Sequence, residues 1–185
     1  MKTGTLSRIA LVVVVMTFAV STASAQLNSG AQTIALNANL TESLTLNLSA
    51  SAVNFTLTPG AAANAGSTNI TATTAWVLKP GRTTVGVYAY FASSAAALTD
   101  GAGNNIPSAD FTISDNGGAA TALTNTVAFG GANAGYQMAN VAITGANKNG
   151  NRNDVMAFNI NLTTLPQLPA NTYTGTLNIQ AQATP

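Results

Sequence analysis

The chain has 185 residues, and its composition excludes several classes of function before any motif is considered. It contains no cysteine and no histidine, which excludes disulfides, serine–histidine or cysteine–histidine catalysis, and the usual zinc sites. Only 6% of the residues are charged, against about a quarter in soluble domains, and so few scattered cations exclude a basic surface for nucleic acid.

The first 25 residues have the pattern of a secretory signal peptide. Lys2 and Arg8 supply positive charge, residues 9–20 are almost entirely apolar, and Ala23-Ser24-Ala25 has the form that signal peptidase cleaves. The apolar run is shorter than the roughly twenty residues that span a bilayer. We therefore expect a signal peptide over residues 1–25 and a mature domain over 26–185 without a transmembrane segment. This predicts a secreted protein in the periplasm, at the cell surface or outside the cell.

The mature chain consists of short segments in which apolar and polar residues alternate, separated by Gly, Pro and Asn. This pattern is typical of an antiparallel sandwich or barrel. The predicted fold is all-β, a single antiparallel immunoglobulin-like β-sandwich, with a jelly roll as the alternative. We expect strands at residues 32–40, 43–49, 52–58, 68–78, 84–92, 109–114, 122–129, 138–144, 155–162 and 172–182.

The alternation also predicts which side chains form the core. The single tryptophan, Trp76, is expected there. The period-two pattern places Val85, Val87, Ala89 and Phe91 on one face of their strand, and Met156, Phe158, Ile160 and Leu162 on one face of theirs. In the last predicted strand it groups Tyr173, Gly175, Leu177, Ile179 and Ala181.

Residues 147–151 are expected to form a polar hairpin tip, because they are rich in Asn and Gly. Residues 100–105 offer one carboxylate, that of Asp100, together with amide oxygens, which are ligands that calcium prefers. A plain turn is the simpler interpretation of this loop, and we expect no cofactor.

The segment at residues 32–40 has two interpretations. Ile34, Leu36, Ala38 and Leu40 share one face of an extended chain. They are expected to pack in the domain's own first strand, because the sequence already supplies a full set of strands. The alternative is that they form a donor strand that completes the sheet of another subunit.

Tyr88 and Tyr90 lie two residues apart, so both rings are on the same face of a predicted strand. If they are exposed, they form a platform on which sugar rings stack; if they are buried, they belong to the core. Tyr136, expected in a glycine-rich loop over residues 130–136, is the third candidate for such a platform.

The C-terminal stretch from Leu165 to Ile179, which contains Leu168-Pro169-Ala170-Asn171-Thr172-Tyr173, carries a family resemblance. It resembles the ending of the spore coat protein U family and of related chaperone–usher pilin subunits, in which a Leu-Pro-Ala turn and a tyrosine precede a final alternating strand. The resemblance implies an immunoglobulin-like sandwich that assembles by strand donation.

These observations predict a function without catalysis, because no nucleophile–base pair is available and the carboxylates fall mostly in turns. We expect a secreted structural or adhesive surface protein, a subunit of fimbrial or coat type. Its partners would be copies of itself or other surface subunits. The alternative is a monomeric secreted module that binds carbohydrate or matrix.

Overall fold

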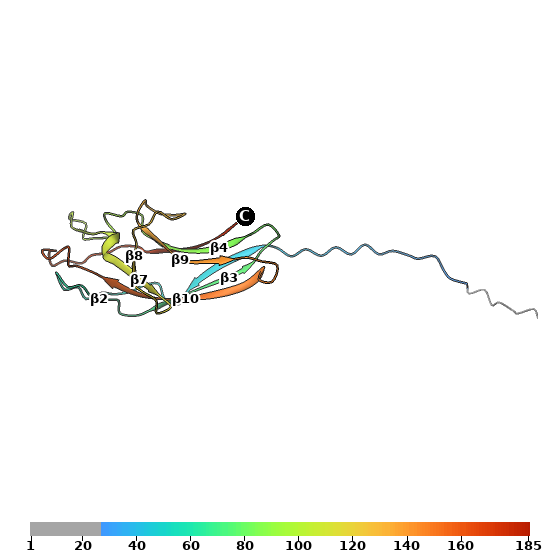
Figure 1. The fold of residues 1–185 in the computed structure, drawn as a ribbon, viewed down its shortest axis with the longest axis horizontal. Coiled ribbons are helices and arrows are strands. Elements are labelled where there is room, and N and C mark those ends of the chain that lie inside the picture. The colour runs from blue at the N-terminus through green and yellow to red at the C-terminus, as the bar shows by residue number, and fades with distance from the viewer. Residues whose placement is uncertain (1–26) are drawn as a thin grey trace, which may run out of the picture. The chain divides into compact units, whose positions relative to one another are not determined.

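The computed structural model describes residues 27–185, and the predicted signal peptide lies outside these residues. Of the described residues, 27–39 belong to one unit and Leu40–Pro185 form a second. The second unit holds the regular structure: two antiparallel sheets that pack face to face as the two layers of a sandwich (Figure 1). The predicted all-β, antiparallel, sandwich-like fold is confirmed at this level.

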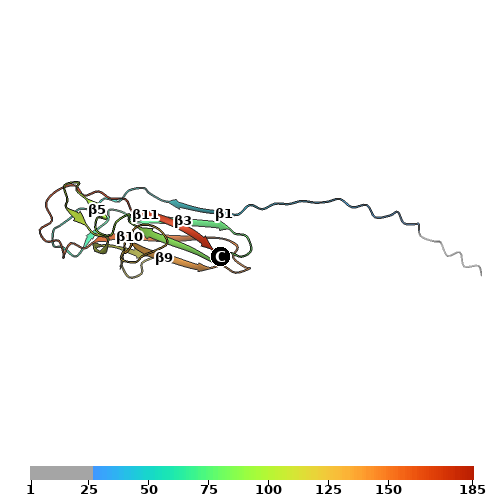
Figure 2. The same ribbon diagram turned by 90° about the horizontal axis from the view of Figure 1, so that it is seen from above.

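The larger sheet has the strand order β1-β3-β10-β7-β8, with the short β2 also paired to β10, and the smaller sheet has the order β11-β4-β9. A separate hairpin joins β5 to β6. Figure 2 shows both β1 and β11 from above. The bounds are β1 Ser43–Leu48, β2 Asn64–Ala65, β3 Ile70–Val77, β4 Thr84–Tyr90, β5 Leu98–Thr99, β6 Asn105–Ile106, β7 Phe111–Asp115, β8 Thr121–Ala122, β9 Gly135–Ala142, β10 Asn149–Ile160 and β11 Asn178–Thr184, with a short 3-10 helix at Ser108–Asp110.

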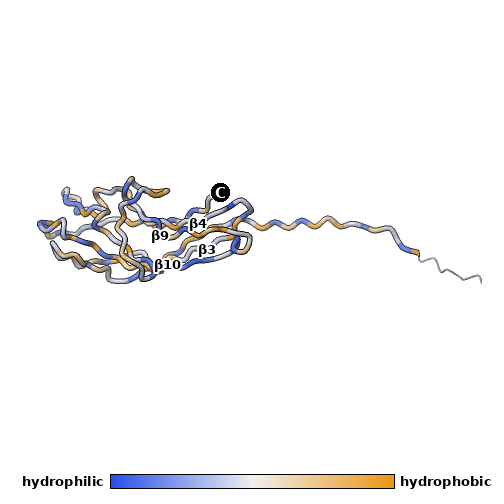
Figure 3. Tube along the Cα trace, in the orientation of Figure 1, coloured by the Kyte–Doolittle hydropathy of each residue, from blue (hydrophilic) through white to orange (hydrophobic). Residues whose placement is uncertain are grey.

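The strands form where the sequence alternates, because each strand turns one row of side chains to the other sheet and one row to solvent. In β3 the buried row is Ile70, Ala72, Thr74 and Trp76, and every residue between them is half-buried. The side chains from the two sheets fill the space between the layers, where Figure 3 shows hydrophobic residues on both. The predicted core residues of β4 and β10 are buried as expected, including Val85, Val87, Met156 and Phe158.

The core has two parts. A small cluster of Trp76, Leu78, Val85 and Ile143 closes one end of the sandwich. The Trp76 side chain is 4% exposed, and its indole Nε1 donates a hydrogen bond to the carbonyl of Asn147 at 2.9 Å. A larger cluster, which includes Phe91, Phe111 and Phe158, fills the rest of the interior.

Several predicted strands are wrong or displaced. Residues 52–58 form no strand and make only an isolated bridge at Phe55. Residues 122–129 contribute only Ala122 of β8 and an isolated bridge at Asn125. The last strand starts at Asn178, because residues 172–177 pair only through Thr174. Residues 149–151 lie inside β10 rather than in a hairpin tip, since the preceding turn closes at Asn147.

The expectation that residues 32–40 form the domain's own first strand is also wrong. No helix or strand is assigned to the described residues before β1, and the first strand of the larger sheet is β1. Apolar and polar residues do alternate in this segment, as Figure 3 shows, but its side chains are exposed. Alternation therefore identified an extended chain but not a partner strand.

Removing the indole of Trp76 tests the closed end of the sandwich. Trp76→Ala should lower the free energy of unfolding by about 3–5 kcal/mol, because it leaves a cavity and removes the bond to Asn147. Chemical denaturation monitored by circular dichroism measures the change. Val155→Ala, at an outward position that is 39% exposed, should change stability by less than about 0.5 kcal/mol. Equal losses in the two variants would contradict the assigned core.

Candidate functional site

A cavity of about 760 Å³ opens between the two sheets at the end away from Trp76. We call it the inter-sheet groove. One wall is the chain after β1, residues 48–57, and the other is the chain before and into β11, residues 168–179. Its floor comes from β3, β7 and β10 through Ile70, Phe111 and Phe158.

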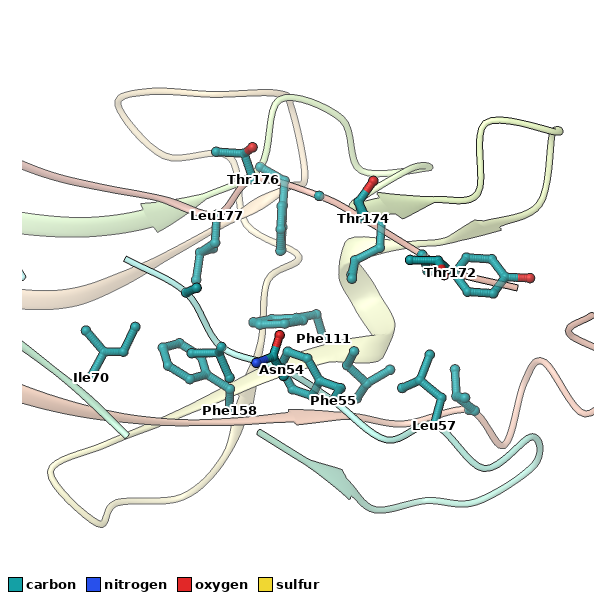
Figure 4. A pocket seen from close by; sticks show the side chains of 18 of the residues that line it. Asn54, Phe55, Leu57, Ile70, Phe111, Phe158, Thr172, Thr174, Thr176 and Leu177 are labelled. Atoms are coloured by element: carbon teal, nitrogen blue, oxygen red, sulfur yellow. The ribbon is translucent and has the colours of Figure 1, made fainter. Parts of the chain in front are cut away.

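The interior of the inter-sheet groove is apolar and aromatic. Phe111 stands at its centre: its ring contacts those of Phe91 and Phe55 edge-on, with ring centres 5.2 and 5.9 Å apart. In Figure 4 the side chain of Leu177 points into the cavity from one wall and Phe55 lies on the opposite side. The hydroxyls of Thr174 and Thr176 point away from it (Figure 4). The groove can therefore accept apolar side chains, and it presents no acid–base pair for chemistry.

The C-terminal wall of the groove is anchored to the chain at residues 97–100. Thr99 and Thr174 exchange two backbone hydrogen bonds of 2.9 Å each. Gly175 makes this approach possible, because a Cβ at this position would collide with the backbone carbonyl of Ala97. Asn171 adds a side-chain bond to Asp100 at 3.1 Å. The wall is thus fixed to the chain at residues 97–100 by backbone and side-chain hydrogen bonds.

The N-terminal wall is held in a similar way. Ser67 donates its backbone N–H to the carbonyl of Asn54 at 2.8 Å, and its hydroxyl accepts the N–H of Asn54 at 3.1 Å. Gly66 lets this segment approach closely, since a Cβ there would lie 2.6 Å from a methyl group of Val53. Both walls are therefore positioned by the domain itself, while the surfaces that face each other across the groove remain apart.

Beside the groove, the smaller sheet ends on an unpaired strand edge. β11 pairs with β4 on one side and with no strand of residues 27–185 on the other. Every second backbone N–H and C=O along an edge strand points away from its single neighbour, which leaves a row of donors and acceptors. The groove thus combines an apolar interior with a free hydrogen-bonding edge.

Asp100 is engaged by protein donors rather than left open for a metal. Its Oδ1 accepts the backbone N–H groups of Ala102 and Asn104 at 2.8 and 3.0 Å, and its Oδ2 accepts the side-chain amide of Asn104 at 2.7 Å. The hydrogen bond from Asn104, aided by those from Ala102 and Asn171, holds the pKa of Asp100 at about 2, below the ordinary 3.8. The loop at residues 100–105 is built as a hydrogen-bonded turn.

The structure places the candidate donor residues together on an exposed segment. Ile34, Leu36 and Leu40 are 85%, 90% and 84% exposed, and Ala38 between them is exposed as well. Large aliphatic side chains with so much area in water are unusual when they come in a row.

The three candidate tyrosines do not come together. Tyr88 and Tyr90 lie on the outer face of β4, where the ring of Phe129 contacts both, with centres 5.8 and 5.9 Å away. Tyr136 lies in β9 rather than in a loop, opposite Ala89, and is half-buried against the core. A β-bulge between Val87 and Tyr88 shifts the register here, and no alternation pattern in a single sequence reveals it.

Sequence reasoning missed the groove itself. The apolar residues of its N-terminal wall, Val53, Phe55 and Leu57, alternate as in a strand, so the segment was predicted as one. Which side chains would meet across the two walls depends on the pairing of distant segments, and the sequence pattern does not encode this. The one local signal was Gly175, which marks a close backbone approach in an otherwise strand-like run.

Within residues 27–185, no three acidic side chains come close enough to hold a metal ion. The described part of the chain also contains no helix with the length and apolarity needed to cross a membrane. Comparison with known proteins found no matching protein-family model, no matching curated protein and no matching solved structure.

Lowering the pH tests the anchoring role of Asp100. A carboxylate whose folded pKa is depressed adds stability above its unfolded pKa of 3.8, and that contribution is lost as the pH falls toward 2. The melting temperature of the native protein should therefore exceed that of Asp100→Asn above pH 3.8, and the difference should shrink as the pH falls to about 2. A difference that stays constant over this range would contradict the role.

Proposed function

We propose that this chain is a non-catalytic, secreted structural or adhesive subunit of fimbrial or coat type, which assembles by donating its N-terminal segment to the inter-sheet groove of another copy. One observation carries the proposal. The chain has an apolar groove beside a free strand edge and, in the same molecule, an exposed segment whose apolar residues alternate.

The strand order supports an immunoglobulin-like interpretation with one strand missing. Such sandwiches place strands A, B, E and D in one sheet and C, F and G in the other. In this interpretation β1, β3, β10 and β7 would correspond to A, B, E and D, and β4 and β11 to C and F, with β9 as an additional strand on the other side of β4. Position G would lie at the free edge of β11, and among residues 27–185 no strand fills it. The resemblance of the C-terminal stretch to pilin-type subunits agrees with this interpretation.

The donor and the groove are chemically matched. Both lack charge: residues 27–41 contain no Asp, Glu, Lys or Arg, and neither do the residues that line the groove. A strand laid along the C-terminal wall, where residues 172–179 lead into β11, would direct every second side chain into the groove, as Ile34, Leu36, Ala38 and Leu40 require. Burying each of the three large side chains contributes about 1.5–3 kcal/mol.

Contacts at the start of β1 favour donation to a different molecule. Glu42 is held by Arg82, whose Nε lies 2.8 Å from Glu42 Oε1, and Arg82 also donates to the carbonyl of Ala183 at 3.3 Å. These contacts hold the start of β1 at the closed end of the sandwich, where Ser43 is paired with Val77, while the groove begins only at Leu48.

Chain length explains why the segment cannot easily fill its own groove. Extended chain advances about 3.3 Å per residue in either direction. A segment that reversed just before Glu42 would therefore lay residues 34–40 along β1. Only residues before Ile34, whose apolar side chains are those of Leu27 and Ala31, would reach the groove wall at 51–57. In a second copy this restriction disappears. Repeated head-to-tail donation then produces an open chain of subunits.

The proposal predicts that assembly depends on which face of the donor segment is changed, the one that would enter the groove or the one that would point outward. The exported mature protein should form oligomers or filaments in size-exclusion chromatography with light scattering. Changing Ile34 and Leu36 to Asp should abolish them, because charge would enter an apolar groove. The matched control changes Ala35 and Asn37 to Asp, which adds the same charge on the outward face. Wild-type protein that stays monomeric at high concentration, or equal loss in both variants, would contradict strand donation.

A synthetic peptide provides a second test that does not depend on polymer formation. A peptide of residues 31–41 should bind the folded Ile34→Asp/Leu36→Asp variant and raise its melting temperature. At a peptide concentration a hundred times the dissociation constant, the free energy of unfolding should rise by roughly 2.7 kcal/mol. A peptide that carries the two Asp substitutions should have no effect. No response to the native peptide would contradict the assignment of the groove.

The runner-up, a carbohydrate-binding module, is favoured by one specific observation. Tyr88, Tyr90 and Phe129 gather on the outer face of the smaller sheet, and the Tyr90 hydroxyl donates to the side-chain oxygen of Gln180 at 2.7 Å. Aromatic rings with neighbouring amides suit neutral sugars. Retention of the monomeric donor variant on a glycan array, lost in Tyr88→Ala, would support it; absence of binding to every glycan would exclude it.

A further inference from the structure

A buried polar cluster lies inside the sandwich, apart from the apolar groove. Asp154 in β10 is fully buried and receives the guanidinium of Arg152, from Nε at 2.6 Å and from Nη2 at 2.5 Å. Asp115, at the end of β7, has only 11% of its side chain exposed, and it lies 3.6 Å from the same guanidinium. Two carboxyl groups thus share one cation in the core.

Each of the two carboxyl groups has one oxygen that lacks a hydrogen-bond donor. Oδ1 of Asp115 and Oδ2 of Asp154 are both buried, and neither has a donor. Asn116 supplies a bond of 3.3 Å to the other oxygen of Asp154, which leaves Oδ2 free. Buried carboxylate oxygens without donors are rare because they lose their hydration without replacement. Two such oxygens on neighbouring acids suggest a missing hydrogen atom rather than a missing side chain.

The surrounding strands offer no other way to balance the charge. Arg152 is the one cation of the cluster. The neighbouring side chain on β3 is the neutral Thr74, whose buried hydroxyl also has no hydrogen-bond partner and cannot neutralise a charge. The strands of the opposite sheet, β4, β9 and β11, contain no Asp, Glu, Lys or Arg, and their titratable residues are Tyr88, Tyr90 and Tyr136. With both acids ionised, the cluster would carry one uncompensated negative charge in the core.

We propose that Asp115 and Asp154 hold one proton between their two unpaired oxygens, so that a carboxyl–carboxylate hydrogen bond joins the end of β7 to β10 and is lost when the proton leaves. Like charges this close cannot both ionise without a large cost, and a shared proton removes the repulsion and satisfies both oxygens. The proposal rests on this cluster alone and is independent of the proposed assembly.

The physical causes acting on Asp115 agree with this arrangement. Burial raises its pKa above the ordinary 3.8, and the charge of Asp154 and a hydrogen bond with it raise the pKa further, while Arg152 opposes them. An acid with a raised folded pKa adds stability that is fully present below its unfolded pKa and lost as the pH rises through its folded pKa. The contribution of the cluster to stability is therefore fully present below pH 3.8 and is lost as the pH rises through the folded pKa of Asp115.

The pairing that the shared proton supports also carries part of the groove floor. β7 and β10 pair from Met156 and Asp115 to Ile160 and Phe111, and Phe111, Met156 and Phe158 line the inter-sheet groove. When the proton is lost, the carboxylates of Asp115 and Asp154 repel each other at the end of this pairing where Met156 lies opposite Asp115. The pH thus acts on the strands that shape the groove without any titratable group inside it.

The test compares the wild-type domain with Asp115→Asn, whose amide mimics the protonated acid and can donate to Asp154. At pH ~8 the variant should melt at a higher temperature than wild type, and the difference should shrink as the pH falls through the folded pKa of Asp115 to below 3.8. The matched control is Asp100→Asn, at an acid whose folded pKa is lowered, and it should not gain stability at alkaline pH. A difference that does not change with pH would overturn the proposal.

A direct measurement distinguishes protonation from any change in folding. Carbon-13 NMR of the aspartate side-chain carboxyl groups, with the Asp115 signal assigned by its absence in Asp115→Asn, should show this group titrating above 3.8 in the folded protein. An Asp115 signal that titrates at or below 3.8 would overturn the proposal, whatever the stability of the variant.

Discussion

An apolar groove next to an unpaired strand edge is the constraint on which the account of this protein depends. The unpaired backbone groups of β11 can form hydrogen bonds with an extended chain. An apolar side chain that packs on the aromatic floor around Phe111 is removed from water, which lowers the free energy of the complex. A soluble domain usually protects such an edge with charge, proline or a covering loop. Here the walls of the groove are held by hydrogen bonds to neighbouring segments of the domain, and the surfaces between them carry no charge.

The two ends of the sandwich are built differently. At one end, Trp76 and its neighbours close the core, and Glu42, Arg82 and the carbonyl of Ala183 join β1 to the end of β11. At the other end, the chain after β1 and the chain before β11 diverge and leave the groove. This polarity suits the proposed head-to-tail assembly, because residues 34–40 precede β1 in the chain and the proposed acceptor groove lies at the open end of the sandwich. The very low charge of the chain adds little repulsion between neighbouring copies.

Much of the fold could be predicted from the sequence, because alternation reports directly which face of a strand is buried. The faces of β3, β4 and β10 were predicted correctly for this reason. Residues 32–40 and 52–58 alternate equally well and yet form no strand, since alternation describes a chain and not its partner. The groove and the Asp115–Asp154 cluster depend on which distant segments meet, and this information was not available from a local pattern. The alternating apolar residues of the segment at 34–40 were identified from sequence, where the donor role now proposed for them was the less favoured of two interpretations.

The central claim is that residues 34–40 of one copy occupy the inter-sheet groove of another, and cross-linking tests it most directly. The native chain has no cysteine, so introduced thiols give an unambiguous result. Leu36→Cys protein would be mixed with Leu177→Cys protein under oxidising conditions and analysed on non-reducing gels, with Ser114→Cys on the outer face of the larger sheet as the control acceptor. The account predicts a disulfide-linked dimer of the first two variants and almost none with the control. Equal cross-linking to Leu177→Cys and Ser114→Cys, or none to either, would contradict it.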